Sequence, residues 1–175
     1  MAPTVIIVPV PEAESAVDLL RRAHTSDGAE GMPAHVTLLY PFTDDSQLVA
    51  GRIAEVRRVL EPFAAFEFVL SEVRRFDNLP SESYVWLAPT PSSPFVAMVD
   101  ELTRAFPEHP PFGGAFTTVV PHLTIAASTD EDLLSRVTNQ IADSLPIKAR
   151  AERACVMQRV GGVWRLRAEV LLSSS

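Results

Sequence analysis

Two motifs of the same pattern, His35-Val36-Thr37 and His122-Leu123-Thr124, carry the residues of this chain best suited to chemistry. Each joins an imidazole, which titrates near neutral pH, to a hydroxyl two residues later. Each also lies in an apolar run typical of a β-strand, where residues i and i+2 point to the same face. One imidazole can take a proton while the other gives one, and the hydroxyls can donate hydrogen bonds to an anion. The two motifs therefore predict an acid-base site.

A metal centre is the alternative that the two histidines also allow. Imidazole is a good ligand for zinc, copper or iron, but such sites usually need a third ligand, and threonine is a poor one. Neither motif strand holds Asp, Glu or Cys, and the single cysteine, Cys155, excludes an intramolecular disulfide and a cysteine metal cluster. We interpret Cys155 as a small apolar side chain in a strand. We therefore expect no metal and no cofactor.

Composition narrows the class of substrate. The 175 residues, 47% hydrophobic and 21% charged, suit one globular domain with a substantial core. The net charge of −7 argues against an extended nucleic-acid surface and leaves a small or short anionic substrate. Lys148 is the only lysine, so we do not expect ligation through a lysine adduct. The apolar run at 5–8 is too short to span a membrane and no basic segment precedes it, and we expect a cytoplasmic monomer that binds no membrane.

The elements that must position the motifs follow the order β-α-β-α-β-β, twice. Helix 11–23 is expected to turn Val17, Leu19 and Leu20 to its apolar side, and 26–31 is expected to be a turn. In chain order, the expected strands span 4–10, 34–40, 66–70, 73–76, 83–88, 119–126, 147–158 and 163–172, and the expected helices span 11–23, 44–61, 92–106 and 129–145.

This order predicts an α+β fold, a single bilobal domain over residues 1–175 with approximate halves 1–80 and 81–175. A motif strand occupies the same place in each half. Duplication with pseudo-twofold symmetry and antiparallel sheets lining a central cleft would then bring His35 and His122 to opposite sides of one site.

The segments Pro33 to Phe42 and Val120 to Ala126 resemble the paired motifs of the two-histidine (2H) phosphoesterase superfamily, most closely its 2′-5′ RNA ligase-like proteins. Element order and motif spacing extend the resemblance over essentially the whole chain. It implies a bilobal, metal-independent enzyme acting on 2′,3′-cyclic phosphates or 2′-5′ linkages. It also implies that His35 and His122 are the acid and base and that Thr37 and Thr124 bind the phosphate. The near-symmetric pair leaves open which histidine is the acid.

Six further side chains are candidates for substrate contacts. Aromatic rings near the motif strands can stack on a base, and an arginine can bind a phosphate. For the aromatic residues core packing is the alternative, and for the arginine a solvated surface position. The six candidates are Tyr40, Arg75, Phe76, Tyr84, Trp86 and Phe112, the last in a Pro/Gly-rich loop expected to form a wall or lid of the cleft.

The leading hypothesis is a metal-independent phosphodiesterase that hydrolyses a 2′,3′-cyclic phosphate or a 2′-5′ bond in a small nucleotide or short RNA end, with ligation possible as the reverse reaction. The first alternative is a non-catalytic module of the same fold that binds a nucleotide or an RNA end. The second is a metal-dependent enzyme, which a chelator would inactivate. Turnover in the presence of a chelator separates the three.

Overall fold

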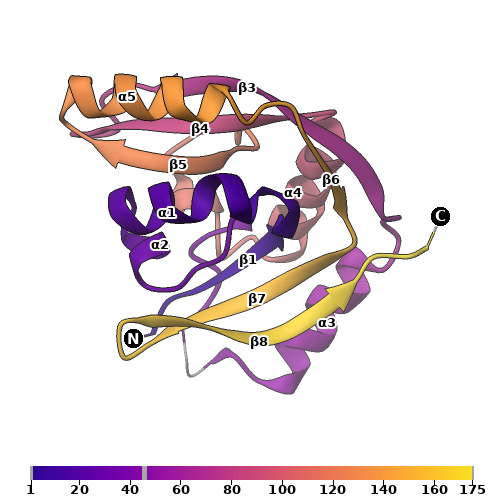
Figure 1. Ribbon diagram of the computed structural model, residues 1–175. Helices are drawn as coiled ribbons and strands as arrows, with labels where there is room; N and C mark the ends of the chain where they lie inside the picture. Colours follow the sequence, from indigo (N-terminus) through magenta and orange to yellow (C-terminus); the bar gives the residue numbers. More distant parts are fainter. Residues whose placement is uncertain (1, 45–46, 175) are drawn as a thin grey trace.

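Two four-stranded sheets form the centre of the computed structural model, which describes residues 2–44 and 47–174 (Figure 1). Every strand pairing within them is antiparallel. The first sheet has the order β2-β1-β7-β8, with β1 at Thr4–Pro9, β2 at His35–Leu39, β7 at Arg153–Val160 and β8 at Val163–Leu171. The second has the order β5-β4-β3-β6, with β3 at Phe66–Phe76, β4 at Ser83–Thr90, β5 at Leu123–Ser128 and β6 at Ile147–Ala151.

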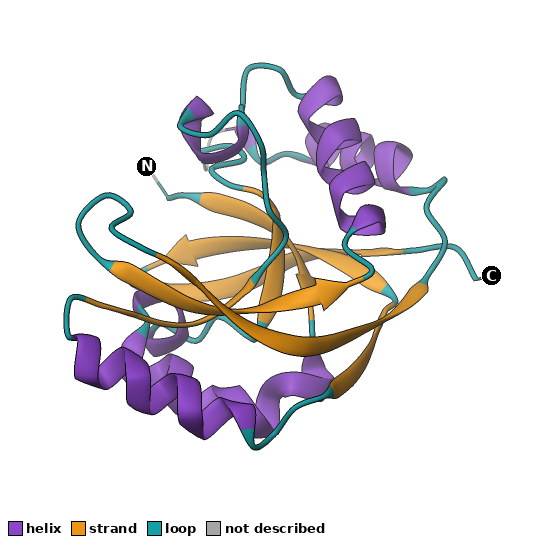
Figure 2. Cartoon of the chain, turned by 90° about the horizontal axis from the view of Figure 1, so that it is seen from above, coloured by secondary structure: helices purple, strands orange, loops and turns teal. Residues whose placement is uncertain are grey.

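Helices flank the strands on two sides, as the view from above shows (Figure 2). Helix α1 packs against β5, and α4 packs against β2. The first long helix of each half therefore lies against the motif strand of the other half. The helices are α1 at Glu14–His24, α2 at Ser26–Ala29, α3 at Ala50–Leu60, α4 at Ser93–Ala105 and α5 at Glu131–Ala142, with single 3₁₀ turns η1 at Pro11–Ala13 and η3 at Pro111–Gly114. None of the helices in the described part of the chain is long and apolar enough to cross a membrane.

The two sheets correspond strand by strand, as the predicted duplication requires. The motif strands β2 and β5 are both edge strands, and β1 and β4 are their neighbours. The lobes nevertheless differ from the sequence halves 1–80 and 81–175, because β3 joins the second sheet and β7 and β8 join the first. Local patterning predicts that a segment is a strand, but it does not say which sheet the strand enters.

Two predictions gave the wrong number of strands: one observed strand was predicted as two, and two observed strands were predicted as one. Segments 66–70 and 73–76 form one strand, β3, whose register shifts between Leu70 and Glu72. Such a bulge breaks the alternation of side chains, so one strand looked like two. Conversely, the predicted strand 147–158 is interrupted at Glu152, and its two parts, β6 and β7, belong to different sheets.

The helical predictions need three corrections. The helix expected over 44–61 begins only at Ala50. Residues 45 and 46, near its expected start, lie outside the described residues. The predicted turn at 26–31 contains the short helix α2, whose first turn is capped by Thr25 Oγ1, which accepts from the Gly28 amide at 3.0 Å. On α1, Leu19 is 82% exposed, and Arg21 is buried instead.

The first sheet separates two apolar clusters. On one face, residues such as Ile6 and Val8 join the main core, which continues to the second sheet and the helices. On the other face, a smaller cluster lies beneath Trp164 and consists of Val5, Ile7, Met32, Cys155 and Met157. Cys155 is 5% exposed, which confirms its predicted position, and burial raises the pKa of its thiol to about 11.

Candidate active site

The two motif strands lie near each other without joining into one sheet. Strands β2 and β5 are edges of different sheets, yet their residues are in contact. His35 is the first residue of β2, and His122 directly precedes β5. The two imidazoles are close enough that a charge on His122 helps to lower the pKa of His35. The fold thus brings both motifs to one region from strands 87 positions apart in the chain.

Both imidazoles are held in the same way. His35 Nδ1 lies 2.7 Å from the Pro33 carbonyl oxygen, and His122 Nδ1 lies 2.7 Å from the Val120 carbonyl oxygen. A carbonyl oxygen can only accept, so each Nδ1 carries a hydrogen and donates it. In the neutral ring, Nε2 then has the free lone pair and can take a proton. The two histidines therefore present the same reactive nitrogen.

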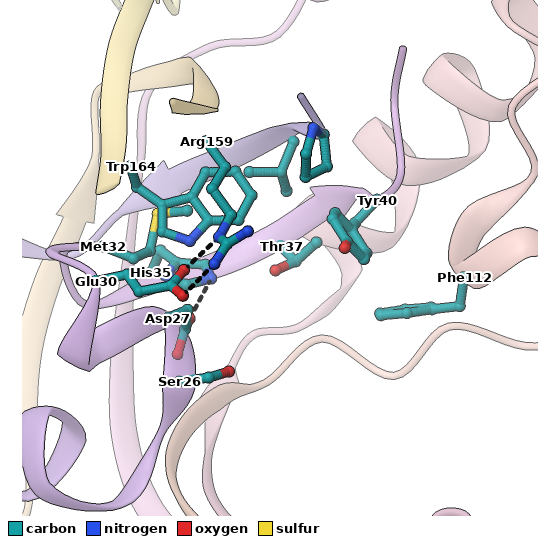
Figure 3. Close-up of a pocket in the computed structure, with 12 residues that line it drawn as sticks. Ser26, Asp27, Glu30, Met32, His35, Thr37, Tyr40, Phe112, Arg159 and Trp164 are labelled. Atoms are coloured by element: carbon teal, nitrogen blue, oxygen red, sulfur yellow. Dashed lines mark hydrogen bonds and ion pairs between the residues drawn. The ribbon is translucent and has the colours of Figure 1, made fainter. Parts of the chain in front are cut away.

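The surroundings of the two Nε2 atoms differ. His35 Nε2 lies 3.9 Å from Asp27 Oδ2 (Figure 3). His122 is instead surrounded by aromatic rings, with the Phe76 centroid 5.1 Å away and edge-on, and the Trp86 centroid 5.8 Å away. A carboxylate stabilises a protonated ring, whereas aromatic packing excludes water. The pair is symmetric in its hydrogen bonds and asymmetric in its charges.

Burial lowers the pKa of both imidazoles. For His35 the pKa falls to about 4, because removal from water and then the charge of Arg21 outweigh the attraction of Asp27. Desolvation also lowers the pKa of His122. The Asp27 carboxyl shows the opposite balance: burial raises its pKa, but Arg21, His35 and hydrogen bonds lower it by more. Near neutral pH both rings are therefore largely neutral in the free protein, and Asp27 is ionised.

The two motif threonines have hydroxyls available for a ligand. Other threonines bind their own backbone, as when Thr103 Oγ1 and Thr138 Oγ1 donate to carbonyls four residues earlier at 2.8 Å. Within residues 2–44 and 47–174, neither Thr37 nor Thr124 makes a side-chain hydrogen bond, and both are half-buried. Two free hydroxyl donors beside two imidazoles can bind the non-bridging oxygens of a phosphate.

A cavity of about 490 Å³ opens beside His35 (Figure 3). Its ionised groups are paired within the protein: Glu30 binds Arg159 through two bonds of 2.7 and 2.6 Å, and Asp27 binds Arg21 at 3.2 Å. Neither His122 nor Thr124 lines this cavity, which therefore extends from the first motif only. The lining residues are Pro3, Val5, Ser26, Asp27, Glu30, Met32, His35, Thr37, Tyr40, Phe112, Arg159 and Trp164.

The candidate aromatic substrate contacts fall into two groups. Tyr40 and Phe112 line the cavity, and the Phe112 amide donates to the Tyr40 carbonyl. Phe76 and Trp86 stack on each other with centroids 4.5 Å apart, and Trp86 is only 3% exposed. These two rings support His122 more than they offer a free surface. Tyr84 is half-buried on the same strand as Trp86, and its hydroxyl donates to Glu82.

Arg75 is not brought to the site. It lies opposite Val85 and binds Glu131 at the start of α5 through two bonds of 2.9 and 3.0 Å. Arg74 faces the other way, opposite Trp86, with its guanidinium carbon 5.9 Å from that ring centroid. The alternation of side chains along a strand predicts this difference, because Phe76 and Arg74 share one face of β3 and Arg75 lies on the other.

Sequence reasoning missed Arg21 and Asp27. The helical period provided a signal for Arg21, since it lies four residues after Val17 and so on the same face of α1, opposite Leu19. Asp27 gave no comparable signal, because it lies in a four-residue helix too short to show a period. Among the described residues, no three His, Cys, Asp or Glu side chains are grouped so that they could hold a metal ion.

Acid is expected to destabilise the folded protein through His35. The folded protein protonates this ring only near pH 4, whereas the unfolded chain does so near 6.5, so acid favours the unfolded state. The contribution is complete above pH 6.5 and is lost as the pH falls toward 4, about 3 kcal/mol at about 1.4 kcal/mol per pKa unit. Urea unfolding of the wild type and of His35→Asn, at about pH 7 and about pH 4, measures it. Equal losses in both proteins would contradict the expectation.

The chain is similar to known proteins in sequence and in fold. The sequence profile of the 2′-5′ RNA ligase superfamily matches residues 9–163. E. coli LigT in its apo form is 15% identical with a TM-score of 0.63, over 99% of this chain and 98% of LigT. The protein TT0787 of Thermus thermophilus is 15% identical with a TM-score of 0.65, over 100% of each chain. A structure described as a phosphoesterase is 12% identical with a TM-score of 0.61, over 99% of this chain and 100% of the other. No functionally curated protein is detectably similar in sequence.

Proposed function

This chain belongs to the 2′-5′ RNA ligase superfamily, and from that premise we propose that it is a metal-independent phosphodiesterase. Its proposed substrates are 2′,3′-cyclic phosphates or 2′-5′ phosphodiester bonds in small nucleotides or short RNA ends. His35 and His122 act as acid and base, and Thr37 and Thr124 bind the phosphate. Ligation is the reverse of the same reaction.

The main support for this proposal is one arrangement of side chains that occurs in both motifs. Each Nδ1 donates to the carbonyl two residues before it, which leaves each Nε2 as the reactive atom. Each imidazole is also followed by a threonine whose hydroxyl has no hydrogen-bond partner in the described part of the chain. A phosphate-binding module would need donors but no pair of proton-transfer groups, so the duplicated pairing favours catalysis over binding alone.

The proposed hydrolysis moves two protons. One neutral imidazole takes a proton from water as the water oxygen bonds to phosphorus. The other imidazole, protonated, gives its proton to the ribose oxygen as the bond from phosphorus to that oxygen breaks. For a 2′,3′-cyclic phosphate that loses its 3′ oxygen, the product is a 2′-phosphomonoester. In-line displacement needs the two groups on opposite sides of the phosphorus, and two motifs from two sheets suit that requirement.

A small substrate is favoured by charge and by the relatives. The carboxylates in the cavity beside His35 are already paired with arginines, so the cavity suits an uncharged nucleoside more than a second phosphate. Its rings, those of Tyr40, Phe112 and Trp164, suit a nucleobase. Structures of E. coli LigT have been determined with 3′-AMP, ATP, NADP+ and phosphate, which supports small nucleotides as ligands of this fold.

The decisive assay follows the phosphorus signal of 2′,3′-cyclic mononucleotides and of 2′-5′-linked dinucleotides by ³¹P NMR, with EDTA present throughout. We expect turnover of at least one of these substrates, and 2′- and 3′-monoester products give distinct signals. A long RNA ending in a 2′,3′-cyclic phosphate serves as the size comparison, and the net charge of −7 predicts that it is not preferred.

Two outcomes would overturn the proposal. Binding of a cyclic nucleotide without turnover, seen as shifts of the His35 and His122 imidazole signals, would identify the non-catalytic module. Absence of turnover in EDTA, followed by turnover when a divalent metal is added in excess of the EDTA, would identify a metal-dependent enzyme.

A further inference from the structure

Arg21 on α1 is the most deeply buried charged side chain of the described residues, with 1% of its surface exposed. A guanidinium taken out of water is costly unless its donors are satisfied. Both terminal nitrogens of Arg21 have hydrogen-bond acceptors. Nη1 donates to the Thr124 carbonyl at 2.7 Å, and Nη2 lies 3.2 Å from Asp27 Oδ2 and 3.3 Å from the Met32 carbonyl, with the Pro33 carbonyl at 3.4 Å.

These partners belong to both motifs. Thr124 is the threonine of the second motif. Pro33 is the residue whose carbonyl also accepts from His35 Nδ1 at 2.7 Å. One planar group thus contacts the backbone of one motif and the backbone that orients the imidazole of the other. Lysine has a single nitrogen at its tip and cannot span such a set of acceptors in the same way.

The need for such a link follows from the sheet topology. Strands β2 and β5 are edges of different sheets, and the described residues include no backbone hydrogen bond between them. No backbone hydrogen bonds therefore fix their separation, and the side chain of Arg21 binds carbonyls beside both strands. The turn that carries Asp27 is also built on Arg21: Thr25 Oγ1 donates to the Arg21 carbonyl at 2.8 Å. A Cβ on Gly28 would come within 2.5 Å of that same carbonyl oxygen, so only glycine fits there.

We propose that Arg21 is a positioning residue that holds the two His-x-Thr strands at the separation at which both histidines reach one phosphate. The inference rests on the proposed function for its kinetic consequences, but not for its structural ones. Arg21 also acts on His35 by charge, since it helps to keep the pKa of that imidazole low and it pairs with Asp27 beside His35 Nε2.

The test compares Arg21→Lys, which keeps the charge, with Arg21→Gln, which removes it. The matched controls are the same substitutions at Arg22, the next residue on α1, whose side chain is 67% exposed and pairs with Asp18. Folding is checked by thermal unfolding, and if Arg21→Gln does not fold, Arg21→Lys carries the test. For Arg21→Lys we expect kcat to fall about 100-fold, with a smaller change in KM, as misplacement of about 1 Å can produce.

A second measurement needs no turnover. Inorganic phosphate is titrated into protein with ¹⁵N-labelled histidine, and the imidazole signals of His35 and His122 are followed. In the wild type, the two imidazole signals should shift with one Kd because both rings contact the same phosphate ion. In Arg21→Lys the two should separate into different Kd values or one should stop responding. The pKa of His35 should rise in Arg21→Gln and stay low in Arg21→Lys, which loss of stability alone would not produce.

The two measurements separate failure of this inference from failure of the proposed function. If the wild type turns over no cyclic nucleotide, yet phosphate shifts both histidines together and Arg21→Lys uncouples them, the positioning role stands. If phosphate does not shift both histidines with one Kd in the wild type, the inference is wrong. It is also wrong if both Arg21 variants keep kcat and the shared phosphate Kd within twofold of the Arg22 controls.

Discussion

Replacing His35 or His122 with alanine is expected to lower kcat on a 2′,3′-cyclic nucleotide by about 10²–10⁴-fold, the loss typical of a general acid or base. The reason is geometric. Each Nε2 is the only reactive nitrogen its ring offers, because Nδ1 is bound to a backbone carbonyl. Asparagine at either position keeps a donor for that carbonyl, but its amide cannot act as an acid or a base near neutral pH. His35→Asn and His122→Asn should therefore fold and remain as inactive as the alanine variants.

The control for these variants is His24→Ala. His24 is half-buried at the end of α1 and belongs to neither motif, so its removal should leave kcat within about twofold. Near-normal activity of either motif variant would contradict two-histidine catalysis.

The pH dependence of kcat/KM should be bell-shaped, because one imidazole must be neutral and the other protonated. Its optimum should lie on the acid side of 6.5, because burial lowers the pKa of both rings in the free protein. Initial rates of hydrolysis measured over a range of pH test this expectation. A profile that is flat between about pH 5 and 8 would count against the mechanism.

Removing the hydroxyl of either motif threonine should be the next largest loss. Thr37→Val and Thr124→Val keep the shape of the side chain and remove one donor, which should lower kcat by about 10²–10³-fold. Serine at the same positions restores a hydroxyl and should recover most of the rate. Steady-state kinetics of the four variants on one cyclic nucleotide measures the effect.

Thr138→Val is the matched control for the threonine variants. Its hydroxyl binds the Leu134 carbonyl within α5 at 2.8 Å, and it takes no part in either motif. We expect its kcat to be unchanged. If Thr37→Val and Thr124→Val behave like Thr138→Val, the free hydroxyls of the motifs do not bind the reacting phosphate.

Strand periodicity separates Phe76 from Arg75 among the predicted substrate contacts. Phe76 lies at the end of β3, and Arg74, two residues earlier, shares its face. Arg75 points to the opposite face and binds Glu131. The same holds on α1, where the helical period places Arg21 with Val17 and turns Leu19 to solvent. In both elements the period of the sequence alone predicts which side chains share a face.

Other features were beyond any local pattern. The exchange of strands between the halves, with β3 in the second sheet and β7 in the first, depends on which edges pair. The same is true of the clustering of Phe76 and Trp86 around His122. These contacts join residues far apart in the chain, and their energies are set only when the sheets pack.

The sequence by itself determined the two strands that carry the motifs and the chemistry that the motifs suit. His35 and Thr37 are an i, i+2 pair within β2, so they share a face whatever that strand packs against. In the second motif only Leu123 and Thr124 lie within β5, and His122 directly precedes it. Only the tertiary structure decided what distinguishes the two histidines. Asp27 and Arg21 come to His35 from a short helix and a long one, whereas aromatic side chains come to His122 from other strands. Charge and burial depend on distances through space, and those exist only in the folded chain.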